Sequence, residues 1–297
     1  MQTMVVTAVA VGIAGGVGWV LTHVNYFVRK KERVEVGRTP SPPQPLSYRW
    51  GGLVIAAGFF SSLLFDNRLV VDDALCTLII GSVFALALGF LDDCTPLHWL
   101  QQLFGQVFLA MVLIFSGMEI TQLNLGEGNV ILFNSWFSWA GSFVTVLWVL
   151  LVMNAINWMD GADGLMGSVV GVALLVLAYL SWQPSVNQPT LVFLMMMLFG
   201  ALIGFLFFNW YPARLIAGSS GASFLGFLVA TLSVYAGAKV ATALLVLAIP
   251  ILDLCSVILT RIRKRKSPFL PDKNHLHHIL LSLGFSSRAV ALIYVSV

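Results

Sequence analysis

The sequence has few charged residues and few cysteines. Of its 297 residues, 10% are charged and 59% are hydrophobic, with a mean hydropathy of +0.91. An ordinary water-soluble domain carries about 25% charged residues, so this class is excluded. The three cysteines, Cys76, Cys94 and Cys255, stand far apart in or near apolar runs. They indicate neither a disulfide framework nor a zinc site, and the composition as a whole predicts a membrane protein.

The sequence instead contains many long apolar runs. A helix needs about 20 apolar residues to cross a bilayer, and hydropathy indicates about ten candidate spans. They lie near residues 3–22, 50–65, 73–91, 99–118, 141–158, 165–181, 190–208, 221–237, 240–260 and 286–297. We therefore predict an all-α fold: a polytopic transmembrane helix bundle that forms one domain over residues 1–297, with the last span cut short.

Basic residues indicate how the bundle is oriented. With the amino terminus outside, the inner loops hold six Lys or Arg between Arg29 and Arg49, one at Arg214, and seven between Arg261 and Arg288, which leaves two of the sixteen outside. Lys and Arg concentrate in cytoplasmic loops, so the polar clusters described below are expected on the cytoplasmic face. Clustering on one face favours an enzyme with cytoplasmic active-site loops over a transporter, whose site usually lies near the midplane.

The longest outer segment has the pattern of a hairpin. Residues 118–141 contain ITQLNLGEGNVILF, two alternating stretches around a Gly-rich turn. Such a pattern is typical of paired strands. We expect a small extracytoplasmic hairpin here.

Two adjacent carboxylates, Asp92 and Asp93, end the third apolar run. Thr95 and Pro96 follow and have the pattern of an N-cap and first turn of the next helix. One interpretation is a pair of interfacial acids near that helix N-terminus. The other is a divalent-metal site, because Mg²⁺ prefers hard oxygen ligands.

Four polar residues recur at three-residue intervals after the fifth run: Asn154, Asn157, Asp160 and Asp163. Residues three apart share a helix face, and the glycines after Asp160 allow the backbone to approach a ligand closely. Amides and carboxylates near a membrane are costly unless they are paired or hydrated. A polar pocket is therefore favoured over a purely structural role.

A second polar region follows the ninth run. Asp253 lies eight residues before Arg261, about 12 Å along a helix, and a carboxylate at that depth requires a partner. A structural ion pair or hydrogen bond with a neighbouring helix and a functional role are both open. The basic run at residues 261–266 is explained most simply by topology, although it would also attract anionic lipid or phosphate.

Three imidazoles, His275, His277 and His278, lie within four residues. They could bind metal, but the chain offers neither nearby cysteines nor a clear fourth ligand. Contact with phosphate or sugar is therefore favoured over zinc, with a solvated loop as the alternative.

The segments LGFLDD, NAINWMDGADGL, NWYPARLIAGSSGASFLGF, IPILDLCSVILTRIRKRKSPF and PDKNHLHHILLSLGFSSR, in this order, resemble the polyprenyl-phosphate N-acetylhexosamine-1-phosphate transferases. The resemblance spans about residues 52–288. The DxxHLHH form at residues 272–278 is more similar to the undecaprenyl-phosphate N-acetylglucosamine-1-phosphate transferases than to the phospho-MurNAc-pentapeptide translocases.

The resemblance implies an activity. A HexNAc-1-phosphate group, with GlcNAc-1-phosphate as the first candidate, would be transferred from a UDP-sugar to undecaprenyl phosphate with release of UMP. The product would start a cell-envelope glycan such as the O-antigen of lipopolysaccharide or teichoic acid. The resemblance also implies Mg²⁺, with Mn²⁺ as an alternative, and a homodimer in the lipid bilayer of a bacterial inner membrane. It gives no reason to expect a nucleic-acid partner.

The resemblance also implies roles for individual residues. Asp92, Asp93 and Asp160 would be catalytic, and together with Ser219 they would lie at the metal. The substrate-binding residues that it implies are Asn154, Asn157, Asp163, Arg261, Arg265, Lys273, His275, His277 and His278.

Two positions depart from the family pattern. The family has Gly-Asp-x-Gly where this chain has Gly218-Ser219-Ser220-Gly221, so a hydroxyl replaces a carboxylate. The family also has a lysine where Gln102 stands. These departures leave an altered substrate, a weakened enzyme and an engineered variant open. They also leave open a non-catalytic homologue that binds a nucleotide sugar or lipid phosphate with a weakened metal site.

Overall fold

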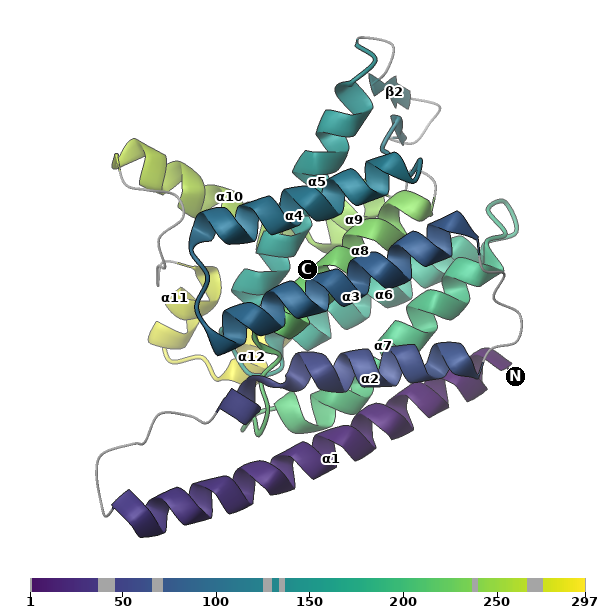
Figure 1. The fold of residues 1–297 in the computed structure, drawn as a ribbon. Helices are drawn as coiled ribbons and strands as arrows, with labels where there is room; N and C mark the ends of the chain where they lie inside the picture. Colours follow the sequence, from purple (N-terminus) through teal and green to yellow (C-terminus); the bar gives the residue numbers. More distant parts are fainter. Residues whose placement is uncertain are drawn as a thin grey trace.

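The computed structural model describes residues 2–36, 46–65, 72–124, 130–133, 137–236, 240–265 and 275–296. Within these residues the fold is a helix bundle with one small hairpin (Figure 1). The elements are α1 (Gln2–Val36), the 3₁₀ turn η1 (Leu46–Arg49), α2 (Gly51–Leu64), α3 (Asp73–Cys94), α4 (Trp99–Phe115), β1 (Gln122–Asn124), β2 (Val130–Leu132), α5 (Ala140–Met159), α6 (Leu165–Trp182), α7 (Pro189–Asn209), α8 (Gly218–Tyr235), α9 (Val240–Val246), α10 (Ala248–Arg263), α11 (Leu276–Ser282) and α12 (Ser287–Ser296).

The all-α prediction is confirmed, and every predicted span falls on a helix. In the described residues, α1, α3, α5, α6, α7 and α8 are long and apolar enough to cross a membrane, and the bent pair α9 and α10 gives a seventh candidate. The helices α2, α4 and α12 are apolar but shorter. The chain is thus a multi-pass membrane protein, and its described residues hold fewer full-length spans than the roughly ten predicted.

The predicted single span at residues 240–260 is wrong in one respect. It is broken at Leu247, where the axes of α9 and α10 differ by 77°. Pro250 explains the break, because a proline ring clashes with the carbonyl four residues earlier, here that of Val246. The bend turns α10 toward the ends of α5 and α11.

The start of α4 also differs from the prediction. The helix begins at Trp99, where His98 is the N-cap and Gln101 accepts the His98 N–H at 2.8 Å in a capping box. Thr95 instead ends α3, and its N–H donates to the last turn of that helix. The prediction that Thr95 and Pro96 open the next helix is wrong because the reciprocal side-chain cap is available only three residues later.

The predicted hairpin between α4 and α5 is confirmed. β1 and β2 pair antiparallel with Leu123 opposite Ile131. The hairpin is small, with three residues in each strand.

The core is built around α8, which is the most buried candidate span and packs against α3, α5 and α2. Small residues allow the close approach: a Cβ added at Gly89 would lie 2.1 Å from the Ser219 carbonyl oxygen, and one at Gly52 would lie 2.3 Å from the Gly221 nitrogen. Close backbone contact at small residues is typical of membrane helices. The ends of α2 and α3 are thereby brought to the first turn of α8.

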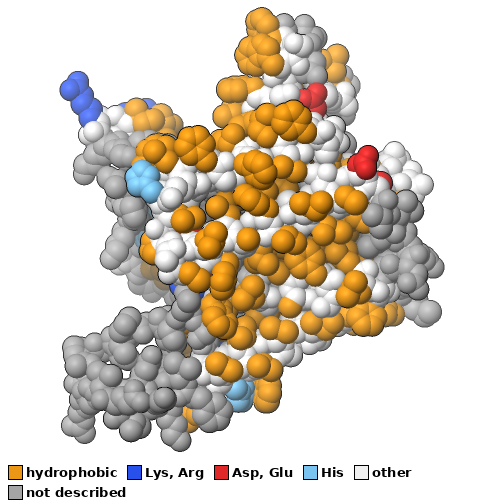
Figure 2. All heavy atoms as spheres, viewed as in Figure 1, with side chains coloured by type: hydrophobic (Ala, Val, Ile, Leu, Met, Phe, Trp, Pro, Cys, Tyr) orange, Lys and Arg blue, Asp and Glu red, His pale blue; other side chains and the backbone are white. Residues whose placement is uncertain are grey.

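The outer face of α3 and α4 is apolar. Figure 2 shows hydrophobic side chains spread across it, with charged side chains only near its margins. Its exposed members include Ile80, Phe84, Phe104, Phe108 and Phe115. A continuous exposed apolar surface of this extent is what a bilayer covers.

Candidate active site

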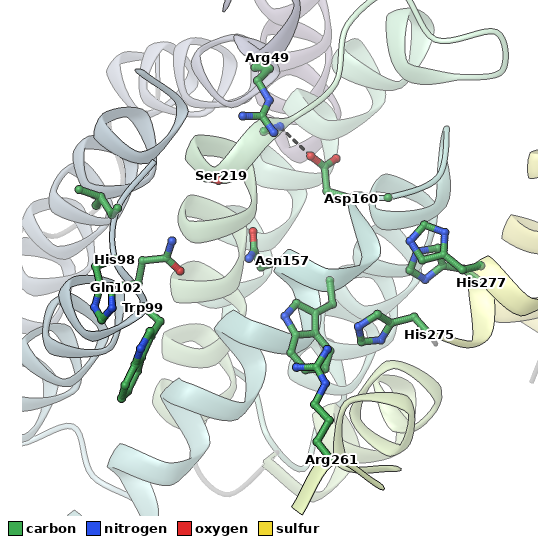
Figure 3. Close-up of a pocket in the computed structure, with 15 residues that line it drawn as sticks. Arg49, His98, Trp99, Gln102, Asn157, Asp160, Ser219, Arg261, His275 and His277 are labelled. Atoms are coloured by element: carbon green, nitrogen blue, oxygen red, sulfur yellow. Dashed lines mark hydrogen bonds between the residues drawn. The ribbon is translucent and has the colours of Figure 1, made fainter. Parts of the chain in front are cut away.

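A cavity of about 670 Å³ opens where η1 and the ends of α4, α5, α8, α10 and α11 meet. Figure 3 shows Gln102, His98 and Trp99 on one side of it and His275, His277 and Arg261 on the other. The predicted site residues that line its wall are Asn157, Asp160, Ser219, Arg261, His275, His277 and His278. Helices far apart in the sequence therefore bring much of the predicted site together.

Two carboxylates hold the first turn of α8. Asp93 accepts the Ser219 N–H through Oδ1 and the Ser220 N–H through Oδ2, each at 2.9 Å, and Asp160 accepts the Gly218 N–H at 2.8 Å. The first N–H groups of a helix have no partner within the helix, and its N-terminus attracts negative charge. These two side chains therefore fix the position of α8 relative to α3 and α5.

Glycine is required at the start of α8. Gly218 has a φ of +69°, and a Cβ there would lie 2.7 Å from both the Arg49 carbonyl oxygen and Asp93 Oδ2. A side chain would be strained by the backbone and would also displace the carboxylate.

Arg49 is a site residue that the sequence analysis counted only as a topology charge. Its guanidinium lies 3.7 Å from the fully buried Asp93 carboxylate, is itself 48% exposed, and reaches the cavity. The signal that could have found it is its place two residues before Gly51 and Gly52, which allow the start of α2 to approach α8. Arg49 supplies positive charge at the cavity edge.

The Asp160 carboxyl lies just beyond the last residue of α5. The pKa of Asp160 is raised to about 7, chiefly by burial and also by the neighbouring Asp93, while the hydrogen bond from Gly218 opposes the shift. A carboxyl that titrates near neutral pH inside a cavity is a typical functional group.

Asp92 faces a different direction from Asp93. Its Oδ1 accepts the Gln102 side-chain amide at 2.9 Å and the Leu97 N–H at 2.8 Å. Gln102 therefore still holds the carboxylate from the position where the family has a lysine. Asp92, Gln102 and Ser219 also line one small gap of about 10 Å³ beside the main cavity.

The opposite wall consists of aromatic and basic rings. The Trp158 ring packs edge-on against the His275 ring at 4.3 Å, and the Arg261 guanidinium lies 5.7 Å from the Trp158 ring centre. Burial lowers the pKa of His277 to about 4, and the nearby His278 and His275 contribute to the shift. Near neutral pH, His277 is therefore a neutral ring.

Asp253 has the partner that its depth required. Its Oδ2 lies 3.1 Å from His275 Nδ1, and its Oδ1 accepts the Leu276 N–H. The contact joins α10 to α11 and fixes the position of the His275 ring in the cavity wall.

Other predicted site residues lie away from the main cavity wall. Asn154 donates to Gln106 at 2.7 Å, and Asp163 accepts the Ala213 N–H at 3.0 Å, which holds the segment between α7 and α8. Arg265 is exposed just beyond α10. Lys273 lies outside the described residues, and the substrate roles predicted for this group stay predictions.

The predicted metal site has few protein ligands among the described residues. Within the described ranges, no group of three or more His, Cys, Asp or Glu side chains is placed to hold a metal ion. Both oxygens of Asp93 accept N–H groups of α8, whereas Asp160 lines the cavity. A single cavity carboxylate still suits Mg²⁺, which commonly takes one or two protein carboxylates and completes its shell with phosphates and water.

An apolar groove of about 390 Å³ adjoins the cavity between α4, α5 and α10. Its wall includes Leu103, Leu147, Leu151, Leu254 and Ile258. The groove and the cavity share four lining residues: Trp99, Gln102, Asn157 and Trp158. The polar cavity and the apolar groove thus meet at one junction.

Residues 75–237 match glycosyl transferase family 4. The chain is 27% identical over 280 residues to the probable undecaprenyl-phosphate N-acetylglucosaminyl 1-phosphate transferase of Bacillus subtilis, covering 90% of this chain and 76% of that protein. It is 30% identical over 321 residues to the decaprenyl-phosphate N-acetylglucosaminephosphotransferase of Mycolicibacterium smegmatis, covering 94% and 75%. It is 27% identical over 281 residues to the undecaprenyl-phosphate alpha-N-acetylglucosaminyl 1-phosphate transferase of Yersinia pestis, covering 88% and 74%. The resemblance found in the motifs is confirmed, and the chain belongs to glycosyl transferase family 4.

Proposed function

We propose that this protein transfers N-acetylglucosamine-1-phosphate from UDP-GlcNAc to undecaprenyl phosphate and releases UMP. The observation that carries the proposal is the junction at Trp99, Gln102, Asn157 and Trp158, where the polar cavity meets the apolar groove. A charged, water-soluble donor and a lipid-bound acceptor need such a meeting point. The relatives are named as polyprenyl-phosphate GlcNAc-1-phosphate transferases, which supports the transferred group and the polyprenyl-phosphate acceptor.

In the proposed reaction, an oxygen of the lipid phosphate attacks the β-phosphorus of the UDP-sugar. A new P–O bond forms, and the bond between the β-phosphorus and the bridging oxygen breaks, so UMP leaves with that oxygen. Both reactants are anionic, and the cations at the cavity, Arg49 and Arg261, offset their repulsion. Asp92, which Gln102 holds beside the cavity, orients the acceptor phosphate.

Mg²⁺ fits this cavity, and Mn²⁺ is the alternative. Asp160 would hold the ion together with the substrate phosphates, with Asp92, Asp93 and the Ser219 hydroxyl nearby. The ion would supply charge neutralisation at the diphosphate. Asp160 also fixes the α8 turn, so one carboxyl joins the protein scaffold to the bound phosphates.

The location and assembly belong to the same proposal. The distribution of basic residues favours a cytoplasmic active site, which is the side on which UDP-sugars are made. The family resemblance supports a bacterial inner membrane. The product would start a cell-envelope glycan. A homodimer is supported only by the family resemblance.

The test is UMP release by purified protein that is given UDP-GlcNAc, undecaprenyl phosphate and Mg²⁺. The proposal predicts release that stops when the lipid phosphate is omitted and that is slower with UDP-GalNAc. The non-catalytic alternative predicts that UDP-GlcNAc binds without any UMP release, and this result would contradict the proposed reaction.

A further inference from the structure

Asp253 is a nearly buried carboxylate for which the proposed reaction has no use. It lies on α10, and the side chains of Asp253 and His275 are 10% and 7% exposed. Its Oδ1 accepts the Leu276 N–H at 2.9 Å, and its Oδ2 lies 3.1 Å from His275 Nδ1. Asp253 therefore caps α11 and contacts one cavity ring at the same time.

The hydrogen bonds determine where His275 carries its proton. An ionised carboxylate only accepts hydrogen bonds, so Nδ1 must donate to Asp253. A neutral His275 then has Nε2 unprotonated on the opposite edge of the ring. Trp158 packs edge-on against this ring at 4.3 Å, and the His277 ring lies nearly parallel to it at 5.8 Å. These contacts restrict rotation of the ring.

His275 is part of the cavity wall, and Figure 3 shows its ring extending into the cavity beside His277. We propose that Asp253 is a positioning residue, which fixes the tautomer and orientation of His275 so that Nε2 faces the sugar-phosphate half of the UDP-sugar. The inference rests on the proposed function for the identity of that ligand. An unprotonated Nε2 accepts a hydrogen bond from a sugar hydroxyl or the acetamido N–H, and a protonated one donates to a diphosphate oxygen.

Replacing Asp253 with asparagine separates this role from helix capping. The amide has one accepting oxygen and one donating NH₂ group, whereas the carboxylate accepts at both positions. The Leu276 N–H cannot change its role, but an imidazole can exchange tautomers. The favoured arrangement in Asp253→Asn keeps the amide oxygen on Leu276 and turns the NH₂ group toward His275 Nδ1. The His275 ring must then carry its proton on Nε2, although the shape of the side chain at position 253 and its hydrogen bond to the Leu276 N–H are preserved.

The experiment combines ring NMR with kinetics. The chain has five histidines, so ¹⁵N-histidine labelling gives few ring signals, and His275→Gln identifies the one from His275. Asp72→Asn is the matched control: Asp72 caps α3 through the Leu75 N–H and accepts the Tyr235 hydroxyl, at the opposite end of α3 from the cavity.

The parent and Asp72→Asn should show His275 protonated at Nδ1, and Asp253→Asn should show it protonated at Nε2. In Asp253→Asn, kcat/KM for UDP-GlcNAc should fall about 10- to 100-fold, the range known for the loss of residues that orient metal-binding histidines, while KM for undecaprenyl phosphate stays unchanged.

An unchanged tautomer in Asp253→Asn would overturn the inference, and lost activity with the parent tautomer would reduce Asp253 to structural support. Undiminished activity despite an exchanged tautomer would also overturn it. If the parent releases no UMP, the proposed function fails, and the tautomer measurement alone decides whether Asp253 positions the ring.

Discussion

Asp93 and Asp160 both hold the first turn of α8, yet their surroundings give them different roles. Asp93 is fully buried, accepts two N–H groups and lies beside Arg49, whereas Asp160 accepts Gly218 and lines the cavity. A buried carboxylate whose two oxygens both accept N–H groups of the same helix turn is committed to the fold. A carboxyl at the cavity remains in reach of a ligand.

Substitution should separate these two roles. In Asp93→Asn, an NH₂ group must face one of two N–H donors, so the free energy of unfolding should fall by roughly 1–3 kcal/mol. Asp160→Asn keeps an oxygen for Gly218 and should leave stability nearly unchanged while UMP release falls at least about 100-fold, the scale of losing one electrostatic group at a reaction centre. Thermal unfolding in detergent and UMP release measure the two effects. Equal loss of stability in both variants would contradict this division.

The raised pKa of Asp160 predicts a pH dependence. The ionised carboxylate is the form that binds a cation, so kcat/KM should rise with pH through about 7. Because the folded state holds this proton more tightly than the unfolded state, the carboxyl favours the folded state most below its ordinary pKa of 3.8, and this advantage is lost as the pH rises to about 7. A pH profile of kcat/KM without a step near pH 7 would contradict the assignment.

At the scale of elements, the crossing of α3 and α8 positions the residues of the site. Gly89 is the closest point, since an added Cβ would lie 2.1 Å from the Ser219 carbonyl oxygen. Gly89→Ala should lower the free energy of unfolding by roughly 1–3 kcal/mol, as overpacking does, and should reduce UMP release by displacing the first turn of α8. Gly171→Ala on α6 is the control, because its nearest neighbours lie at 3.6 Å or more. Chemical denaturation compares the two, and equal stability would refute the close approach.

The helices α4 and α8 place Gln102 and Ser219 around one small gap beside Asp92. Relative to the family pattern, Gln102 replaces a positively charged lysine and Ser219 replaces a negatively charged aspartate. Ser219→Asp alone adds a carboxylate near Asp92, Asp93 and Asp160 and should be destabilising, whereas the double variant with Gln102→Lys restores the balance of charge. The expected coupling is about 0.5–3 kcal/mol in thermal unfolding. Strictly additive effects would show that the two positions are independent.

For the whole molecule, the sequence predicted what depends on local patterns. Apolar runs predicted the helices, because a membrane-spanning helix must be apolar along its length. Alternating residues around a Gly-rich turn predicted the hairpin, because successive side chains of a strand point to opposite faces. The break at Leu247 was missed, although Pro250 carried its signal.

Contacts between distant segments could not be predicted in the same way. The Arg49–Asp93 pair joins η1 to α3, and the Asp253–His275 pair joins α10 to the start of α11 across 22 residues, which is beyond the reach of a local sequence pattern. The spacing of Asn154 and Asp163 predicted one shared face with Asn157 and Asp160, but α5 ends at Met159, and so Asp163 holds Ala213 instead. Helix periodicity does not continue past the end of a helix.

We propose that the polar cavity and the apolar groove together hold the two substrates of one lipid product. The most direct test of this proposal is mass spectrometry of the lipid fraction after the parent protein has been incubated with UDP-GlcNAc, undecaprenyl phosphate and Mg²⁺, beside Asp160→Asn. We predict undecaprenyl diphosphate GlcNAc from the parent in amounts equal to the UMP released, and almost none from the variant. UDP-GlcNAc bound by a folded parent protein that forms no such lipid would contradict the account.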